Sequence, residues 1–254
     1  MGEKSRRMKN FLLKHPVCCF CGGSQQSTTQ DHLPPRSVFD NKKWPEGYVF
    51  PACYDCNSGS SKYDSIFALV SRIHPSSEES DDVKNETEKL ILAYLEQYPQ
   101  EAASLKLSAN EKKRWAKNSN FKLAKGQSYG ELSIIKMPNF WNRSVEIVST
   151  KLIKALHYKH TGKIVPKDSG IRIKWWTNAQ YIAGQFPKEL TELVGERAFV
   201  KREKLNLSNQ FSYSYQTSEN GQLAIYGAYF RFLFYVVGLV SFDASLLKVD
   251  ANFD

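Results

Sequence analysis

Two Cys-X-X-Cys pairs constrain the fold of this 254-residue chain more than any other feature. Cys18 and Cys21 form the first pair, Cys53 and Cys56 form the second, and 31 residues separate them. Two such pairs can present four thiolates to one tetrahedral zinc ion, and a site with four protein ligands is structural rather than catalytic. The fifth cysteine, Cys19, lies outside this spacing. The sequence therefore predicts a zinc-stabilised module with a long inserted loop.

The start of the chain and its charge indicate the cellular context. The first residues are basic but contain only a short apolar run, so we expect no secretory signal and a cytoplasmic protein. In that reducing compartment paired cysteines favour metal binding over disulfides. The formal net charge of +9, from 35 Lys/Arg and 26 Asp/Glu, favours nucleic acid as the partner, with an anionic membrane surface as the second choice.

One apolar segment, residues 223–242, is long enough to cross a bilayer. Arg231 lies in its middle, however, and its many β-branched and aromatic residues are typical of buried strands. We therefore expect one or two strands here and no membrane association.

Hydrophobic periodicity predicts an α+β fold. The expected organisation is an N-terminal module with structural zinc (residues 1–75), a helical connector (76–125) and a C-terminal α+β domain (126–254) of unknown role in substrate or partner binding. Apolar spacing predicts helices at 1–15, 63–73, 83–98, 108–118 and 142–160. Alternating residues predict strands at 171–176, 198–202, 210–216 and 223–240, which form an antiparallel sheet packed on the helix at 142–160.

The loop between the cysteine pairs contains the doublet Asp31-His32, and Asn57 directly follows the second pair. Neighbouring side chains of a strand point to opposite sides, so Asp31 can bind a metal while His32 faces a substrate. Together the three residues offer two oxygen ligands for a hard cation and one imidazole. The simpler alternatives are a loop hydrogen bond for His32, a turn acceptor for Asp31 and a helix N-cap for Asn57.

These motifs, within residues 18–64, resemble the HNH or ββα-metal endonuclease family. The resemblance implies that the doublet lies on the first strand of a hairpin, that Asn57 lies on the following helix, and that zinc attaches the hairpin to the helix. It implies that Asp31 and Asn57 hold a catalytic Mg²⁺ or Mn²⁺ and that His32 is the general base. Two features depart from the family: Tyr48 stands where an Asn commonly holds the loop, and Lys62 follows Asn57 by five residues instead of three.

The expected function is hydrolysis of phosphodiester bonds in DNA, most simply double-stranded DNA, with Arg36 and Lys62 contacting phosphates. A non-catalytic, zinc-stabilised nucleic-acid-binding protein is the alternative, because the departures at Tyr48 and Lys62 are compatible with lost activity. A membrane-associated effector that uses residues 223–242 is a third reading.

Overall fold

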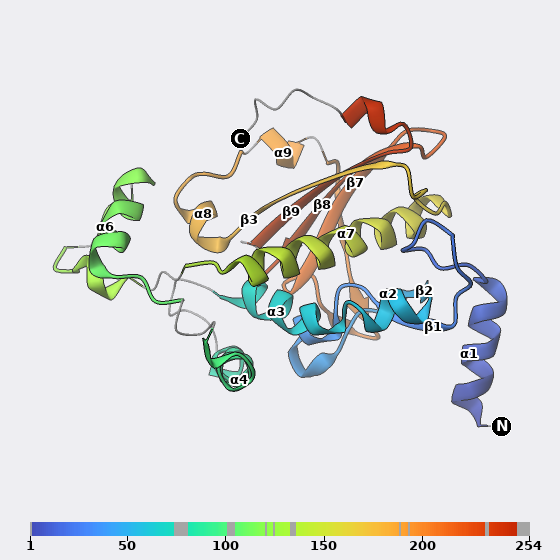
Figure 1. Cartoon of the computed structure of the whole chain (residues 1–254), viewed down its shortest axis with the longest axis horizontal. Coiled ribbons are helices and arrows are strands. Elements are labelled where there is room, and N and C mark those ends of the chain that lie inside the picture. Colours follow the sequence, from blue (N-terminus) through green and yellow to red (C-terminus); the bar gives the residue numbers. More distant parts are fainter. Residues whose placement is uncertain are drawn as a thin grey trace.

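The computed structural model describes residues 2–73, 81–100, 105–119, 121–123, 125–132, 136–187, 189–192, 194–231 and 234–247. It has a mixed α+β architecture, as the sequence predicts: one antiparallel sheet of five strands, a long helix along it, and a smaller hairpin with its own helices (Figure 1).

The N-terminal part begins with helix α1 (Glu3–Lys14), which ends before Pro16. Strands β1 (Thr29–His32) and β2 (Val49–Ala52) form an antiparallel hairpin in which His32 pairs with Val49. The loop between them contains the short 3-10 helices η1 (Arg36–Val38) and η2 (Asp40–Lys42). Helices α2 (Tyr54–Ser58) and α3 (Ser61–Arg72) follow. A hairpin followed by a helix is the order that the sequence predicts.

The connecting region contains helices α4 (Asp81–Gln97) and α6 (Ala109–Asn118) and the 3-10 helix η3 (Tyr129–Glu131). Ser108 caps α6: its hydroxyl accepts from the Glu111 N–H, and the Glu111 carboxylate accepts from the Ser108 N–H. This capping box confirms the predicted start of that helix.

The C-terminal part consists of helix α7 (Asn139–Thr161) and the five-stranded sheet, in the order β3-β9-β8-β7-β4. The helix ends at Gly162, whose φ of 68° is left-handed. The strands of the sheet are β3 (Gly170–Trp176), β4 (Arg197–Phe199), β7 (Phe211–Thr217), β8 (Leu223–Phe230) and β9 (Phe234–Ser241). The smaller elements are α8 (Asn178–Ile182), α9 (Glu189–Glu192), β5 (Lys201–Arg202), β6 (Leu205–Asn206) and η4 (Ala244–Leu247).

The apolar segment at 223–242 forms most of the last hairpin. Strands β8 and β9 pair antiparallel, and the chain reverses beside Arg231, whose φ is 46°. None of the described helices combines the length and the apolar character that crossing a bilayer requires.

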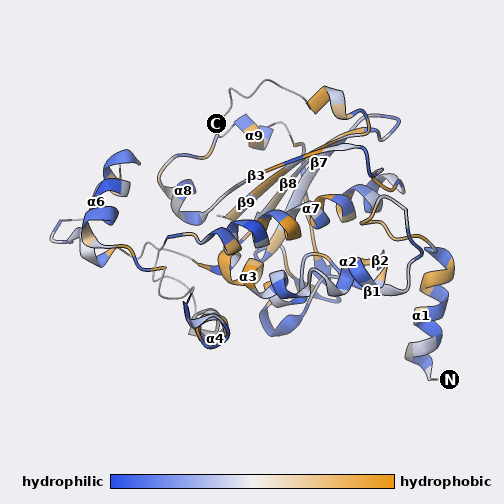
Figure 2. Cartoon of the chain, in the orientation of Figure 1, coloured by the Kyte–Doolittle hydropathy of each residue, from blue (hydrophilic) through white to orange (hydrophobic). Residues whose placement is uncertain are grey.

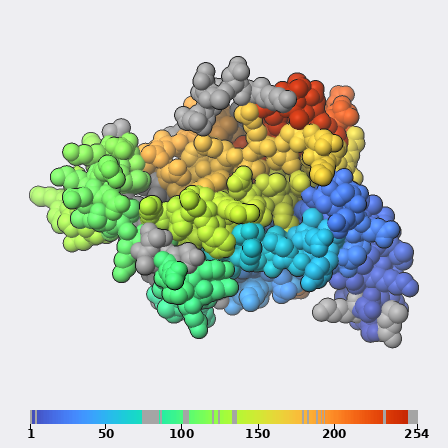
Figure 3. All heavy atoms as spheres, viewed as in Figure 1, coloured from blue at the N-terminus to red at the C-terminus, as the bar shows by residue number. Residues whose placement is uncertain are grey.

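The buried residues of the N-terminal and C-terminal parts pack together. Helix α3 lies along α7 (Figure 3), and Phe67 on α3 contacts Phe230 and Phe234 of the sheet at ring-centroid distances of 5.0 and 5.8 Å. A Cβ atom built on Gly238 would lie 2.3 Å from Ile153, so only glycine allows α7 to approach β9 so closely. Figure 2 shows hydrophobic segments on α3 and on the strands that face this interface. One hydrophobic core therefore joins the hairpin module to the sheet.

Candidate functional site

The four paired cysteines form one cluster. Cys18 and Cys21 precede the hairpin, while Cys53 and Cys56 lie at the start of α2, and the four sulfur atoms all lie within 4.8 Å of one another. Tetrahedral zinc–thiolate bonds place their sulfurs about 3.8 Å apart, so this group can bind a metal ion such as zinc. The fifth cysteine, Cys19, is buried and is not part of the group. The structure thus confirms the four-cysteine site that the spacing predicts.

Backbone N–H groups support the sulfur atoms. The Phe20 N–H donates to Cys18 Sγ at 3.4 Å, and the Cys56 N–H donates to Cys53 Sγ at 3.5 Å. The pKa of the Cys18 thiol is lowered to about 4, chiefly by a hydrogen bond from Cys56, whereas burial raises the pKa of Cys53. The thiols of Cys53 and Cys56, whose pKa values are raised, would lose their protons on binding a metal ion, because thiolates are the ligands that zinc takes.

Asp31 lies on the side of β1 that faces α7 and is almost fully buried. Its Oδ1 accepts from the His32 N–H at 2.8 Å, and its Oδ2 forms an ion pair with the ammonium of Lys151 on α7. The same ammonium donates to the Cys56 carbonyl oxygen at 2.9 Å and to Ser60 Oγ. Lys151 therefore connects the long helix to both the hairpin and the second cysteine pair.

A second carboxylate lies near this ion pair. Burial, and then the charge of Asp31, raise the pKa of Asp64 to about 7, while the charge of Lys151 opposes the shift. Two carboxylates and one ammonium carry a net negative charge when Asp64 is deprotonated. The cluster of Asp31, Asp64 and Lys151 therefore attracts cations.

His32 has different neighbours from Asp31, as neighbouring residues of a strand should. Its ring contacts Trp44 edge-on at a centroid distance of 4.8 Å. Burial, and then the positive charge of Arg36, lower the pKa of His32, while Asp31 opposes the shift. The imidazole is therefore neutral at pH 7 and has a nitrogen lone pair that can accept a proton.

Two arginines lie over the same tryptophan. The guanidinium carbons of Arg36 and Arg202 are 4.1 and 4.5 Å from the centroid of the Trp44 ring, and Arg202 Nη1 donates to the Trp44 carbonyl oxygen at 3.2 Å. Four exposed lysines flank these arginines in sequence. We call the set the basic surface; its residues are Arg36, Lys42, Lys43, Lys201, Arg202 and Lys204.

Asn57 and Lys62 lie on the helices that follow the hairpin. Asn57 Nδ2 donates to Thr29 Oγ1 at 3.1 Å and to the Gln30 carbonyl oxygen at 3.2 Å, so Asn57 attaches α2 to β1 next to Asp31. Cys53 and Ser60 are the N-caps of α2 and α3, so the N-cap alternative for Asn57 is wrong. Lys62 is exposed, with its ammonium 5.0 Å from the Tyr63 ring, and within the described residues it contacts neither Asp31 nor His32.

The loop that contains Tyr48 is held by the second half of the chain. Tyr48 is buried and donates through its hydroxyl to the Tyr213 hydroxyl at 3.0 Å. Lys159 Nζ on α7 donates to the Gly47 carbonyl oxygen at 3.1 Å, and the Glu46 N–H donates to the Lys201 carbonyl oxygen at 3.1 Å. Contacts to α7, β7 and β5 therefore fix the loop.

Sequence reasoning missed Lys151, Trp44 and Arg202. Lys151 and Arg202 lie 120 and 158 residues from their partners Asp31 and Trp44. Within its own helix Lys151 precedes the buried Leu152, and nothing in that pattern distinguishes it from a solvated lysine at the edge of an apolar face.

The oxygen atoms near the doublet suit a hard divalent cation. The carboxylates of Asp31 and Asp64 are of the type that Mg²⁺ and Mn²⁺ prefer, and the Asn57 side-chain oxygen makes no hydrogen bond to a described residue. Lys151 contacts the same carboxylate that a metal ion would use, so it competes for that position. Comparisons with protein-family models, curated proteins and solved structures give no match for this chain.

Proposed function

We propose that this protein is an HNH-type, metal-dependent endonuclease that hydrolyses DNA. The proposal rests on one observation: next to a four-cysteine cluster, the first strand of a β-hairpin has a buried carboxylate and a histidine with a lowered pKa as consecutive residues, Asp31 and His32. This is the arrangement that the sequence resemblance implies.

His32 is the general base in this proposal. Phosphodiester hydrolysis needs a water molecule that loses its proton near neutral pH, and a neutral imidazole performs that task. The hydrogen bond between the His32 N–H and Asp31 Oδ1 fixes the backbone at the doublet, and the Trp44 ring restricts the imidazole. A divalent ion held by Asp31 and Asn57 would stabilise the negative charge that develops on the phosphate.

The basic surface supplies the nucleic-acid contacts. Arg36 and Arg202 lie against the ring that contacts His32, so a phosphate bound to either arginine lies near the imidazole. Planar guanidinium groups bind phosphate with two parallel hydrogen bonds, which positions the backbone without reading the base sequence. Lys62 is a further candidate for a phosphate contact, because it follows Asn57 in the motif.

A non-catalytic nucleic-acid-binding protein is the second candidate. The observation that favours it is the ion pair between Asp31 and Lys151, because an ammonium already neutralises the carboxylate that a metal ion would use. In that case the cysteine cluster and the basic surface would serve binding alone.

Supercoiled plasmid incubated with the purified protein and either Mg²⁺ or Mn²⁺ separates the two candidates. If the protein is a nuclease, the plasmid should become nicked or linear, and EDTA should abolish this cleavage. His32→Ala and Asn57→Ala should cleave much more slowly than the wild type while keeping its zinc content and melting temperature. A gel shift in EDTA without cleavage under either ion would support the binding protein and refute the nuclease.

A further inference from the structure

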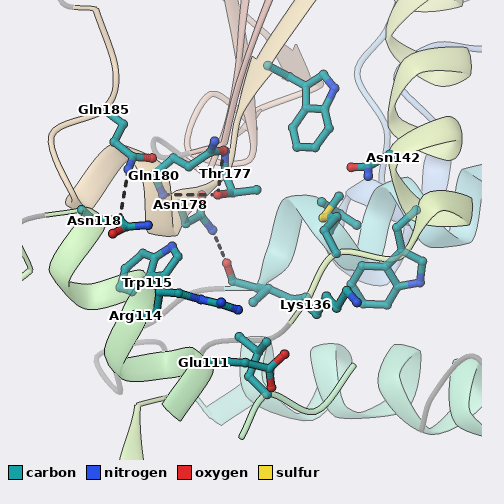
Figure 4. Close-up of a pocket in the computed structure, with 17 residues that line it drawn as sticks. Glu111, Arg114, Trp115, Asn118, Lys136, Asn142, Thr177, Asn178, Gln180 and Gln185 are labelled. Atoms are coloured by element: carbon teal, nitrogen blue, oxygen red, sulfur yellow. Dashed lines mark hydrogen bonds between the residues drawn. The ribbon is translucent and has the colours of Figure 1, made fainter. Parts of the chain in front are cut away.

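A cavity lies at the N-terminal end of α7. This cavity of about 720 Å³ opens between α6, the C-terminal end of α3, the N-terminal end of α7 and the β3–α8 connection (Figure 4). Trp141 lines this cavity and lies ten residues before Lys151 on the same helix, so the two sites are about 15 Å apart along the helix axis. The volume is in the range of small-molecule sites.

Aromatic rings form much of the wall. Three of the five tryptophans of the chain line the cavity, Trp115, Trp141 and Trp175, together with Ile73 and Met137. The rings come from three different elements, α6, α7 and β3. Trp115 and Trp175 are half-buried and offer ring surface on which a planar heteroaromatic ligand can stack, whereas Trp141 is 1% exposed and forms the back of the wall.

Amide side chains supply the polar part of the wall: Asn118, Asn142, Asn178, Gln180 and Gln185. Three of them already have protein partners: Gln185 donates to Ser119 Oγ at 3.0 Å, Gln180 accepts from the Thr177 N–H at 2.9 Å, and Asn178 donates to the Ile73 carbonyl oxygen. The side chains of Asn118 and Asn142 make no hydrogen bonds within the described residues. Each of these two amides therefore has both a donor and an acceptor for a ligand.

Two buried polar atoms of the wall also lack partners in the described part of the chain. They are the acceptor Asn178 Oδ1 and the donor Trp141 Nε1, on side chains of residues that are 3% and 1% exposed. Buried polar groups are rarely left unpaired in folded proteins. A planar ring with hydrogen-bond donors and acceptors along its edge would provide partners for such atoms.

The charge at the cavity is positive. Arg114 and Lys136 line it, and neither side chain forms a close ion pair or a hydrogen bond with another described residue. Glu111 is the one acidic residue among the described residues of the lining, and its carboxylate accepts hydrogen bonds from the N–H and the hydroxyl of Ser108 in the cap of α6. Hydrogen bonds from Ser108, and then the charges of Lys136 and Arg114, lower the pKa of Glu111. Figure 4 shows Arg114 and Trp115 next to each other on α6, opposite Thr177, Asn178 and Gln180.

We propose that this cavity binds a nucleotide, with the base between the tryptophans, its edge on the amides, and the phosphate at Arg114 and Lys136. The cavity combines aromatic rings for stacking, amides for in-plane hydrogen bonds and cations for an anion. A nucleotide is the class of metabolite that uses all three. The proposal does not depend on the endonuclease, because neither the cysteine cluster nor Asp31, His32 or Asn57 lines the cavity.

Titration of the full chain with 5′-AMP, 5′-GMP, 5′-CMP and 5′-UMP, followed by tryptophan fluorescence and calorimetry, tests the proposal. At least one nucleotide should bind saturably with a Kd below about 1 mM. Arg114→Gln should weaken that binding at least ten-fold, and the corresponding nucleoside and inorganic phosphate should each bind more weakly than the nucleotide. Lys117→Ala is the matched control, since Lys117 is exposed on the same helix and does not line the cavity.

Two results would overturn the proposal: no saturable binding of any of the four nucleotides, or unchanged binding by Arg114→Gln. Trp115→Ala serves as a second variant, whose melting temperature is checked because the Trp115 ring also packs against Phe121 at a centroid distance of 5.6 Å. His32→Ala should bind nucleotide as the wild type does. Nucleotide binding therefore tests the cavity alone, and the plasmid assay tests the endonuclease alone.

Discussion

The ammonium of Lys151 forms an ion pair with Asp31 Oδ2 across 120 residues of sequence. Both side chains are almost buried, and the same ammonium also donates to the carbonyl oxygen of Cys56. The C-terminal part of the chain therefore reaches the centre of the hairpin module. A divalent ion bound at Asp31 would therefore compete with Lys151 for one carboxylate.

This competition predicts the behaviour of Lys151→Met. Removing one partner of a buried ion pair leaves an uncompensated charge, so the variant should lose roughly 3–5 kcal/mol of unfolding free energy in the absence of divalent ions. Mg²⁺ or Mn²⁺ should then raise the melting temperature of the variant more than that of the wild type. Lys154→Met is the control, because Lys154 lies on the same helix and donates only to the neutral carbonyl of Phe20. Equal responses of wild type and Lys151→Met to the ions would contradict a cation site at Asp31.

The cysteine cluster predicts bound zinc. Elemental analysis of purified protein should find about one zinc ion per chain. Cys53→Ser should lose most of it and unfold at lower temperature, because the second cysteine pair starts α2 and the metal joins that helix to the hairpin. Cys19→Ala should keep the zinc, since Cys19 is not in the cluster. A metal-free wild type, or equal zinc contents in the two variants, would be incompatible with a four-cysteine site.

Arg36 should contribute to DNA affinity through its charge. Because it lies over Trp44 and beside His32, Arg36→Gln should weaken binding of duplex DNA and reduce the slope of log K against log salt by about 1. Lys117→Gln removes one positive charge from α6, away from the hairpin, and should leave the slope unchanged. Fluorescence anisotropy in EDTA at several salt concentrations measures both. If the two variants behave alike, the basic surface is not the DNA contact.

His157 predicts how stability depends on pH. Burial lowers the pKa of His157 to about 4, and its Nδ1 lies 3.1 Å from the Tyr226 hydroxyl. In the unfolded chain a histidine binds a proton below about pH 6.5, so the contribution of His157 to stability is complete above that pH and declines as the pH falls toward 4. Between pH 6.5 and 5 the loss from this one residue is about 1.5 kcal/mol. Urea unfolding of His157→Gln should show a correspondingly weaker pH dependence over this interval; an unchanged slope would exclude His157 as the source.

Local patterns in the sequence predicted the parts of the structure that depend on neighbouring residues. The Cys-X-X-Cys spacing predicted the cluster, because each pair brings two sulfurs together within a few residues. The apolar stripe at 142–160 predicted α7, and the alternating residues at 210–216 predicted β7. These features need no knowledge of what packs against them.

Local patterns could not predict the contacts between segments that are distant in the sequence. Tyr48 departs from the resemblance as a sequence position, yet its hydroxyl bonds to Tyr213 on β7 and thereby holds the loop. Two of the cations beside the doublet and its tryptophan, Lys151 and Arg202, likewise come from the C-terminal part. Periodicity defines which face of an element is apolar but not which remote element covers it, so these partners could not be predicted.

The proposed role of His32 as the general base of a DNA-cleaving site is tested by the cleavage rate of His32→Ala. With excess protein over supercoiled plasmid in saturating Mn²⁺, loss of a general base should slow cleavage by roughly 10²–10⁴-fold while DNA binding in EDTA stays unchanged. Cleavage by His32→Ala at the wild-type rate, with zinc content and melting temperature also unchanged, would contradict the account.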